Sequence, residues 1–411
     1  MKFGVLSNRR VLELGSMIAA PFATHILSQL GAEVIKIEPP GGETTRKLVR
    51  GGPSGTYIAY NRGKKSLCVD LQSSRGQEIF RDLVREADIV VHNLSPGAAR
   101  KLGVTYDDCA ALNPDIVFCH IKGYGPGPLA EEIASNPIAE AATGVMYGNR
   151  VNGKPARLGP SYHDQFAGCY AVMGVLAALL DATGSPDRRN IELGLYETGL
   201  HIAARELVAV QLKSHLTGKP ESEPSPEFSM PGYGAYETAD GRWVYLVMLS
   251  DEHWRRFCSA AQIAADPELA TLRQRRRLRP QVEAMVSDAV RALPFEEITA
   301  RLDKADVGFT EVLPPDRVLA AQQARQPQKS ARFDFTDFDF ESPNFPVPSC
   351  TADTGQHLPP PLLGEHTRYL LERMGYSEEA ILSLINDGIA IVADPDPDLW
   401  SRERRLEGRE T

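Results

Sequence analysis

The sequence RVLELGSMIAAPFATHILSQLGAEVIKIE (residues 10–38) predicts a strand, a helix and a second strand in close succession. Its first five residues are typical of a buried strand, and Pro21 suits the first turn of the helix that follows. That helix, over residues 22–30, is expected to end at a glycine, the usual residue beyond a helix C-terminus. A second strand at residues 33–38 completes a βαβ unit, which predicts an α/β fold with a parallel sheet.

The alternation of strands and helices continues beyond residue 65. Further strands are expected at residues 66–71, 89–92 and 116–121, with helices at residues 75–86 and 97–102. Several of these strands are followed at their C-termini by basic or glycine-rich loops, and ligands of open α/β sheets bind at that edge. Lysines so placed could hold the separated phosphates of a nucleotide-bearing ligand, although any one of them could be a solvated surface side chain. The candidates are Lys64, Lys65, Lys101 and Lys122.

The turn after the first strand, Gly-Ser-Met-Ile-Ala-Ala (residues 15–20), lacks the G-x-G-x-x-G pattern. Without those glycines the backbone cannot approach a pyrophosphate in the way that dinucleotide-binding proteins require. The sequence therefore disfavours a nicotinamide- or flavin-dependent dehydrogenase.

The composition argues against several classes of protein. The chain has 411 residues, 42% of them hydrophobic and 24% charged, which is enough for a large core and for more than one domain. A net charge of −9 gives no indication of nucleic-acid or anionic-membrane binding. We expect no transmembrane span, because no apolar run reaches the necessary length, and no signal peptide. Six cysteines without CxxC spacing indicate a reducing, cytoplasmic location and no zinc site.

The second half of the chain predicts a separate domain. Residues 217–230 are rich in proline and serine and form a linker. An Asp-Gly pair at residues 240–241 predicts a β-hairpin, and residues 252–305 predict mostly helices. Residues 329–350, which are aromatic and proline-rich, are expected to return the chain from this domain with little regular structure. A last helix at residues 367–374 would precede a charged tail.

A long apolar helix headed by a single carboxylate is expected within SYHDQFAGCYAVMGVLAALL (residues 161–180). Small residues follow Asp164 and leave room for another chain segment or a ligand. The positive end of a helix favours an ionised carboxylate, and such a carboxylate can act as a nucleophile. Asp164 could equally be an N-cap that only satisfies helix amides. A strand near residue 190 then leads into a helix that runs to about residue 216.

Short motifs spread over nearly the whole chain resemble the family III CoA-transferases, the group that includes formyl-CoA transferase and carnitine CoA-transferase. The matching stretches are LGAEVIKIE (30–38), NRGKKS (61–66) with DL (70–71), NLSPG (93–97), KGY (122–124), GPSYHDQFAG (159–168), TADG (238–241) and PLLGEHT (361–367). One such stretch would be weak evidence, but this many in one order is specific. In the family the aspartate that opens this helix is the nucleophile, and Asp164 occupies that place.

The resemblance implies a fold that the sequence pattern alone would not give. It implies a Rossmann-like large domain built from both chain ends and a smaller inserted α+β domain. Residues 1–216 would form the first part of the large domain, residues 217–330 the linker and small domain, and residues 331–411 the return segment and the C-terminal part of the large domain. Two copies would interlock like links of a chain to form a homodimer.

The resemblance also implies the activity, which is transfer of CoA from an acyl-CoA donor such as succinyl-CoA to a carboxylic acid acceptor. Asp164 would form an anhydride and then an aspartyl–CoA thioester. No cofactor would be bound permanently, because coenzyme A arrives as part of the substrate. The amides of Gly123, Gly232 and Gly234 would stabilise the oxyanions. The residues implied as CoA contacts are Val69, Asn93, Leu94, Lys101, Lys122 and Tyr124.

The chain departs from the family pattern at three places. Pro39 stands where many members have arginine, and Ile18 stands where a polar residue is common. Residues 134–137, Ala-Ser-Asn-Pro, replace a Gly-Tyr-Asp pattern. These differences leave the acceptor acid unidentified.

Three alternative functions are open. An α-methylacyl-CoA racemase needs a paired histidine and aspartate to move an α-proton, and Ser135 stands where that histidine would fall. An intramolecular CoA-transferase, acting within one dicarboxylic acyl-CoA, would use the same aspartate. A non-catalytic partner subunit of a heteromeric transferase would be expected to lack the nucleophile, so Asp164 argues against it.

Overall fold

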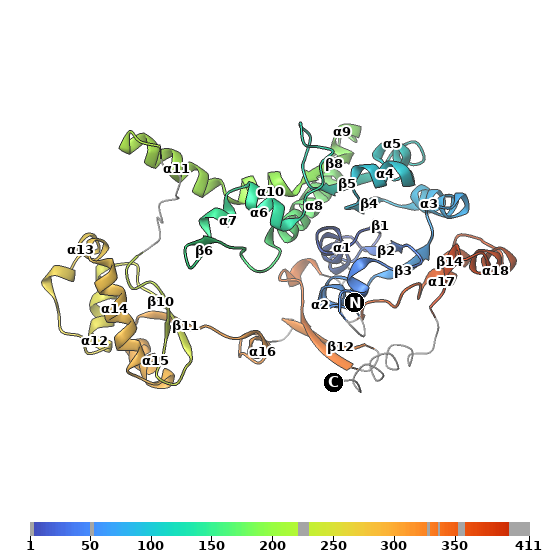
Figure 1. The fold of residues 1–411 in the computed structure, drawn as a ribbon. Helices are drawn as coiled ribbons and strands as arrows, with labels where there is room; N and C mark the ends of the chain where they lie inside the picture. The colour runs from blue at the N-terminus through green and yellow to red at the C-terminus, as the bar shows by residue number, and fades with distance from the viewer. Residues whose placement is uncertain are drawn as a thin grey trace. The chain divides into compact units, whose positions relative to one another are not determined.

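The computed structural model describes residues 4–49, 53–220, 230–326, 329–335, 338–351 and 358–393. The chain divides into two compact units (Figure 1). Met1–Glu223 and Gln326–Thr411 form the large unit, and Pro224–Arg325 form the small unit. Both ends of the chain thus contribute to the large unit.

A seven-stranded sheet forms the centre of the large unit, with the strand order β14-β3-β2-β1-β4-β5-β8. β14 is antiparallel to β3, and all other neighbouring strands are parallel. The predicted α/β class with a parallel sheet is confirmed, and the strand order reverses between β1 and β4 as in doubly wound folds. The strands are β1 Arg10–Leu14, β2 Glu33–Glu38, β3 Lys65–Val69, β4 Ile89–His92, β5 Val117–Lys122, β8 Asn190–Gly194 and β14 Ala390–Ile391.

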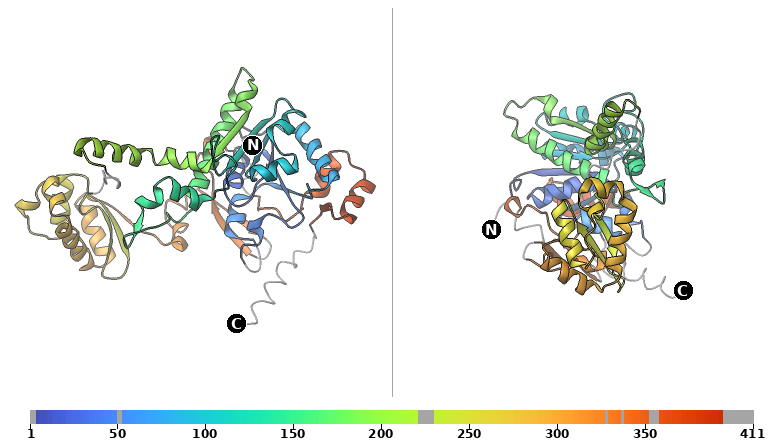
Figure 2. Two further views of the ribbon diagram at one scale, coloured as in Figure 1. Left: turned by 45° about the horizontal axis from the view of Figure 1, so that its top comes forward. Right: turned by 90° about the vertical axis from the view of Figure 1, so that its left-hand side faces the viewer.

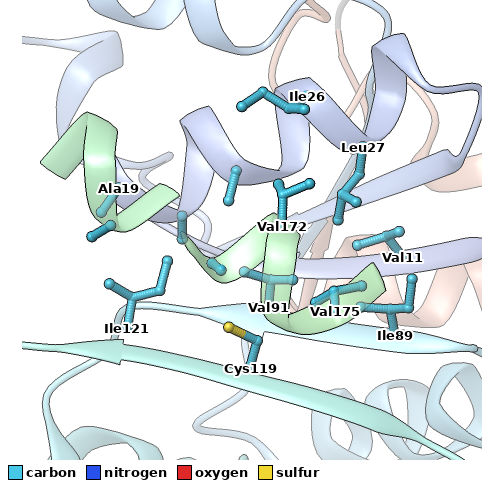
Figure 3. Close-up of a cluster of buried hydrophobic side chains, with 14 of the residues drawn as sticks. Val11, Ala19, Ile26, Leu27, Ile89, Val91, Cys119, Ile121, Val172 and Val175 are labelled. Carbon is cyan, nitrogen blue, oxygen red and sulfur yellow. The ribbon is translucent and has the colours of Figure 1, made fainter. Parts of the chain in front are cut away.

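Helices cover both faces of this sheet. On one face, apolar side chains of α1 and α8 pack against alternate residues of the strands, among them Val11, Val91 and Cys119 (Figure 3). On the other face, α3, α17 and α18 pack against the intervening residues, such as Leu12 and Val90. Both faces are buried, which explains why the strand sequences are nearly continuous apolar runs.

The helices of the large unit include most of those predicted. They are α1 Ala19–Gln29, α2 Gly55–Tyr60, α3 Ser74–Glu86, α4 Pro96–Leu102, α5 Tyr106–Ala110, α6 Asn136–Ala142, α7 Val145–Gly148, α8 Tyr162–Leu180, α9 Pro186–Arg189, α10 Leu195–Ile202, α11 Ala204–Thr217, α17 Thr367–Arg373 and α18 Glu378–Asn386, with 3-10 turns at Thr44–Arg46 and Pro348–Cys350. The single helix expected up to about residue 216 is wrong, because α10 and α11 are separated at Ala203. Most side chains of α11 are exposed, and in Figure 2 this helix extends beyond the sheet.

The C-terminal segment is bonded to the N-terminal half of the chain. His366 N–H donates to Ser66 O at 3.0 Å, and Cys68 N–H donates to Thr367 Oγ1 at 3.0 Å. Beyond the predicted last helix, the structure adds α18 and then β14, which extends the sheet at β3. The expectation of only a charged tail after residue 374 is therefore wrong, because Ile381 and Leu384 supply a buried apolar face.

Two short hairpins also belong to the large unit, β6 Arg150–Val151 with β7 Lys154–Pro155, and β12 Ser330–Phe335 with β13 Phe338–Pro343. The second one contradicts the prediction of little regular structure at residues 329–350. In β12, buried Ala331 and Phe333 alternate with exposed Arg332 and Asp334. This period of two is typical of a strand with one buried face. The aromatic residues therefore mark a strand face.

Six charged side chains form a buried cluster at the β1–β3 part of the sheet: Glu13, Lys36, Glu38, Glu43, Arg46 and Lys64. Glu13 accepts hydrogen bonds from Lys36 Nζ and Lys64 Nζ, both at 2.7 Å. Arg46 binds both carboxylate oxygens of Glu38 at 2.7 Å. Burial alone would raise the pKa of Glu13, but the two ammonium groups lower it to about 2. Five of these charges are therefore paired with one another inside the protein, and Glu43 accepts hydrogen bonds from Ser16 and Thr45.

This cluster corrects the interpretation of two lysines. Lys64 lies before β3, its side chain is fully buried, and Nζ also donates to Pro21 O and Asn61 Oδ1, both at 2.9 Å. Lys65 Nζ pairs with Glu33 at 2.5 Å. Because both ammonium groups are committed to partners at the start of a strand, neither is placed to hold a phosphate at the carboxyl edge.

The small unit has a three-stranded antiparallel sheet, ordered β11-β10-β9, covered by helices. Its strands are β9 Gly234–Glu237, β10 Trp243–Val247 and β11 Gly308–Glu311. Its helices are α12 Asp251–Ala260, α13 Leu272–Arg277, α14 Arg279–Arg291, α15 Phe295–Lys304 and α16 Pro315–Val318, with a 3-10 turn at Pro267–Leu269. The predicted hairpin is confirmed, since β9 and β10 pair across the turn that holds Gly241 at φ 76°. Within the predicted linker, residues 221–229 lie outside the described residues.

One described helix, α8, is long and apolar enough to span a membrane by length and composition, with 19 residues and a mean hydropathy of 1.2. This corrects the expectation that no apolar run reaches that length. Ala167, Ala171 and Val175 are buried, and they belong to the core that α8 forms with α1 and the sheet. In this structure α8 is a helix of the protein core.

Candidate functional site

A cavity of about 440 Å³ opens in the large unit at the carboxyl ends of β1, β4 and β5. The strand order reverses between β1 and β4, so the cavity lies where doubly wound folds usually bind ligands. Arg157 and Ser161 line it from the segment that leads into α8, and Asp164 lines it from the first turn of that helix. The other lining residues include Met17, Ile18, Asn93, Leu94, Lys122, Gly123, Glu132, Ser135, Asn136 and Leu195.

The start of α8 is capped from another helix. Ser161 holds the N-cap position but makes no side-chain cap bond. Instead Asn136 of α6 accepts hydrogen bonds at Oδ1 from the amides of His163, at 2.9 Å, and Asp164, at 3.3 Å. Asp164 is therefore not the N-cap, and its carboxylate is not needed to satisfy the helix amides. Asn136 is itself held by Glu140, whose Oε1 accepts from Asn136 Nδ2 at 2.5 Å.

The Asp164 carboxylate is half-buried beside the cavity, and no described residue donates a hydrogen bond to it. The pKa of Asp164 is raised to about 7, because burial raises it strongly, Arg157 only partly opposes that effect, and the nearby charge of Glu140 adds to it. An unbonded carboxylate with a pKa close to neutral is typical of functional sites, since a merely structural aspartate would be paired or exposed.

Replacing Asp164 with asparagine should stabilise the protein above pH 7. The raised pKa means that the folded state binds a proton more tightly than the unfolded state, so the free energy of unfolding falls as the pH rises from about 4 to about 7. Asparagine removes that loss, with a gain of up to about 4 kcal/mol at pH 8. Urea unfolding of both proteins at pH 4 and pH 8 measures the difference, which should be much smaller at pH 4. Equal differences at both pH values would contradict the raised pKa.

Side chains hold the β1–α1 turn at the edge of the cavity. Ser16 N–H donates to Asn93 Oδ1 at 2.9 Å, and Asn93 Nδ2 donates to Ser16 O at 2.8 Å. Met17, in the left-handed region at φ 65°, directs its N–H to Glu43 Oε2 at 3.4 Å. Because these amides are already occupied, the turn cannot cradle a pyrophosphate in the dinucleotide-binding manner.

The cavity brings together five of the residues predicted from the sequence, namely Asp164, Gly123, Asn93, Leu94 and Lys122. Lys122 is only partly available to a ligand, because its Nζ pairs with Glu192 at 2.8 Å and its side chain is 8% exposed. Gly123 lies so close to Ala134 that an added Cβ would come within 2.5 Å of Ala134 N. A larger residue at position 123 would therefore displace the cavity wall.

The other predicted residues lie away from this cavity or in the small unit. Val69 is buried in the core of the sheet, Lys101 is exposed in the last turn of α4, and the Tyr124 ring lies 5.6 Å from that of Tyr196. Gly232 is in the small unit, at φ 81°, and its N–H donates to Glu283 at 3.2 Å. That bond uses the amide that was predicted to bind an oxyanion. Gly234 begins β9, opposite Leu246 of β10.

Three residues of the site had no functional interpretation in the sequence. Arg157 is the cation whose charge lowers the pKa of Asp164, and Glu140 and Asn136 support the helix start. In the sequence, the feature that could have indicated a role for Asn136 was its position in the Ala-Ser-Asn-Pro segment, which departs from the family pattern. Within the described ranges, no three His, Cys, Asp or Glu side chains are grouped to hold a metal ion.

Comparisons with known proteins agree on one family. The model of CoA-transferase family III matches residues 6–367. Succinyl-CoA:glutarate CoA-transferase of Mus musculus is 30% identical, over 93% of this chain and 90% of that protein. Succinyl-CoA–D-citramalate CoA-transferase of Chloroflexus aurantiacus is 28% identical, over 92% of this chain and 96% of that protein. The crystal structure of a CAIB/BAIF family protein from Brucella suis shares the fold, with a TM-score of 0.78 at 24% identity, covering 91% of this chain and 100% of that chain.

Proposed function

Because this chain belongs to CoA-transferase family III and is an acyl-CoA:carboxylate CoA-transferase, we propose that it transfers CoA through covalent intermediates on Asp164. The observation that supports this proposal is the Asp164 carboxylate, which borders the cavity without a hydrogen-bond donor among the described residues. Its pKa of about 7 leaves a large fraction ionised at neutral pH and also makes the carboxylate more basic than an ordinary aspartate. Succinyl-CoA is the proposed donor, since the curated relatives from mouse and Chloroflexus are named for it.

The proposed reaction conserves the thioester through four exchanges at carbonyl carbon. Asp164 attacks the donor thioester, the C–S bond breaks, and CoA thiolate leaves behind a mixed anhydride. The thiolate attacks the aspartyl carbonyl, which gives an Asp164–CoA thioester and the donor's free carboxylate. The acceptor carboxylate attacks this thioester to form a second anhydride and thiolate. The thiolate then attacks the acceptor's carbonyl, which gives the new acyl-CoA and frees Asp164.

Other residues of the cavity would support these steps. The Gly123 amide, at the wall of the cavity, is the proposed donor to the oxyanions of the tetrahedral intermediates. Arg157 adds a positive charge near Asp164 and would attract the anionic acceptor. The two chain ends that build the large unit support the interlocked homodimer implied by the family resemblance.

Trapping with hydroxylamine tests the covalent intermediate. When the donor acyl-CoA is supplied without an acceptor, the Asp164–CoA thioester should accumulate, because the anhydride is recaptured quickly by the thiolate held beside it. Hydroxylamine should convert that aspartate to a hydroxamate, and peptide mapping by mass spectrometry should find the change at Asp164. Omitting the donor provides the control and should leave Asp164 unmodified. An enzyme inactivated by this treatment with Asp164 unmodified would show that the nucleophile is another residue.

The racemase alternative receives less support from the cavity. That reaction needs a histidine paired with an aspartate across the α-carbon. No histidine lines the described cavity, and Ser135 occupies the corresponding place. His163 is fully buried next to Asp164, and its Nε2 lies 3.3 Å from Thr143 Oγ1. Exchange of the α-proton with deuterated solvent, without CoA transfer, would favour the racemase.

A further inference from the structure

Two histidines stack at the carboxyl ends of β4 and β5. The ring centroids of His92 and His120 are 4.1 Å apart and the ring planes differ by 26°. His92 is fully buried and His120 is 8% exposed. His92 also contacts Phe118 in an edge-to-face arrangement, with 5.1 Å between ring centroids. The rings are thus fixed by packing, which restricts the directions in which their nitrogens can bond.

Both histidines bond to the backbone of one residue, Leu94. Leu94 N–H donates to His92 Nδ1 at 3.3 Å, and His120 Nε2 lies 2.8 Å from Leu94 O. Nδ1 of His92 must therefore be unprotonated, and Nε2 of His120 must carry a hydrogen. His92 Nε2 has no hydrogen-bond partner although it is buried. A histidine that leaves one nitrogen unsatisfied is costly, so its retention calls for a reason beyond packing.

The bonded segment forms part of the cavity wall. Asn93 and Leu94 both line the cavity that contains Asp164. The Asn93 side chain is bonded to Ser16 N and O, while the Leu94 N–H and C=O are bonded to the two histidines. The segment is therefore held on both sides, and its position depends on two rings that do not themselves border the cavity.

We propose that His92 and His120 are positioning residues for the acyl-CoA substrate, because together they fix the Leu94 peptide at the wall of the cavity. This inference rests on the proposed function and on the family resemblance, which implies that Asn93 and Leu94 contact the CoA part of the substrate. Loss of either bond lets the segment move. Such movement weakens binding of acyl-CoA and leaves the chemistry at Asp164 unchanged. Small displacements of positioning groups have large effects on substrate recognition.

Paired substitutions test the two bonds. His120→Leu and His92→Leu remove them, and His120→Asn keeps an amide that is too short to reach Leu94 O. His120→Gln retains a nitrogen near the place of Nε2, and His92→Asn retains an acceptor near the place of Nδ1. We expect the KM for acyl-CoA to rise about tenfold or more in His120→Leu, His92→Leu and His120→Asn. The kcat of these variants should stay within about twofold of the wild-type value. His120→Gln and His92→Asn each keep a group that can make the bond to Leu94, so the KM of these two variants should stay near that of the wild type. His215→Leu, on the exposed part of α11, is the control for the substitution itself.

The outcomes separate this inference from the proposed function. Wild-type protein should bind CoA alone in isothermal titration calorimetry, and failure of that binding would count against the proposed CoA site. Wild-type binding together with an unchanged KM in His120→Asn would overturn the positioning role of His120. If the leucine variants do not fold, His120→Asn and His120→Gln still decide the question. A fall in kcat with KM unchanged would also contradict the inference.

Discussion

Asp164→Asn should lower the rate of CoA transfer by about a thousandfold or more, because the amide cannot attack a thioester as a carboxylate does. The side chain keeps its shape, and the helix start depends on Asn136 rather than on the Asp164 carboxylate. The fold should therefore be retained. Steady-state assays with succinyl-CoA and a panel of carboxylic acids, followed by mass spectrometry of the acyl-CoA products, measure the effect.

Asp187→Asn is the matched control for this change. Asp187 is exposed in the first turn of α9, so the same substitution there should leave transfer unaffected. Far-UV circular dichroism of both variants should equal that of the wild type. If purified Asp164→Asn kept a substantial part of the wild-type turnover, the assignment of the nucleophile would be wrong.

Glu13→Gln should lower the free energy of unfolding by about 3–5 kcal/mol. Glu13 is the carboxylate that both Lys36 Nζ and Lys64 Nζ approach to 2.7 Å, and all three side chains are fully buried. Removing the negative charge leaves two ammonium groups without their counter-ion in a region that water does not reach. Urea denaturation at pH 7 measures the loss as a lower midpoint with an unchanged slope.

An exposed ion pair provides the comparison for Glu13. Arg100 and Glu131 pair at 2.7 Å, but their side chains are 59% and 66% exposed. Glu131→Gln should therefore change the stability far less than Glu13→Gln does. If Glu13→Gln were as mild as Glu131→Gln, the buried cluster would not contribute to stability in the way that its geometry indicates.

The sheet could be predicted because its strands are short apolar runs bounded by glycine and proline. Residues 89–92 were predicted with the bounds of β4, and residues 33–38 with those of β2. α1 begins at Ala19, three residues before the predicted start, and Pro21 lies inside its first turn, as the sequence indicated. Local patterns thus locate elements well and their first turns less well.

The polar interior could not be predicted because its partners are far apart in the sequence. Two adjacent lysines at residues 64–65 are compatible both with a phosphate-binding site and with a buried ion pair. Only the fold shows that Glu13, 51 positions earlier, meets Lys64. In the same way, the bond between Asn136 and the start of α8 spans 27 positions, so Asp164 could be mistaken for the cap. The apolar stripe of α18 and the alternation in β12 were local signals, and they were missed.

The pairing of β14 with β3 has a consequence for synthesis on the ribosome. β3 ends at Val69 and its edge partner begins at Ala390, so the outer edge of β3 waits for 320 intervening residues to be translated. At rates of about 5–20 residues per second, that delay lasts roughly 15–60 s. During this time the nascent chain presents an unpaired strand edge, which is a site for aggregation. β14, near the end of the described chain, thus pairs with an edge of β3 that stays unpaired while most of the protein is being synthesised.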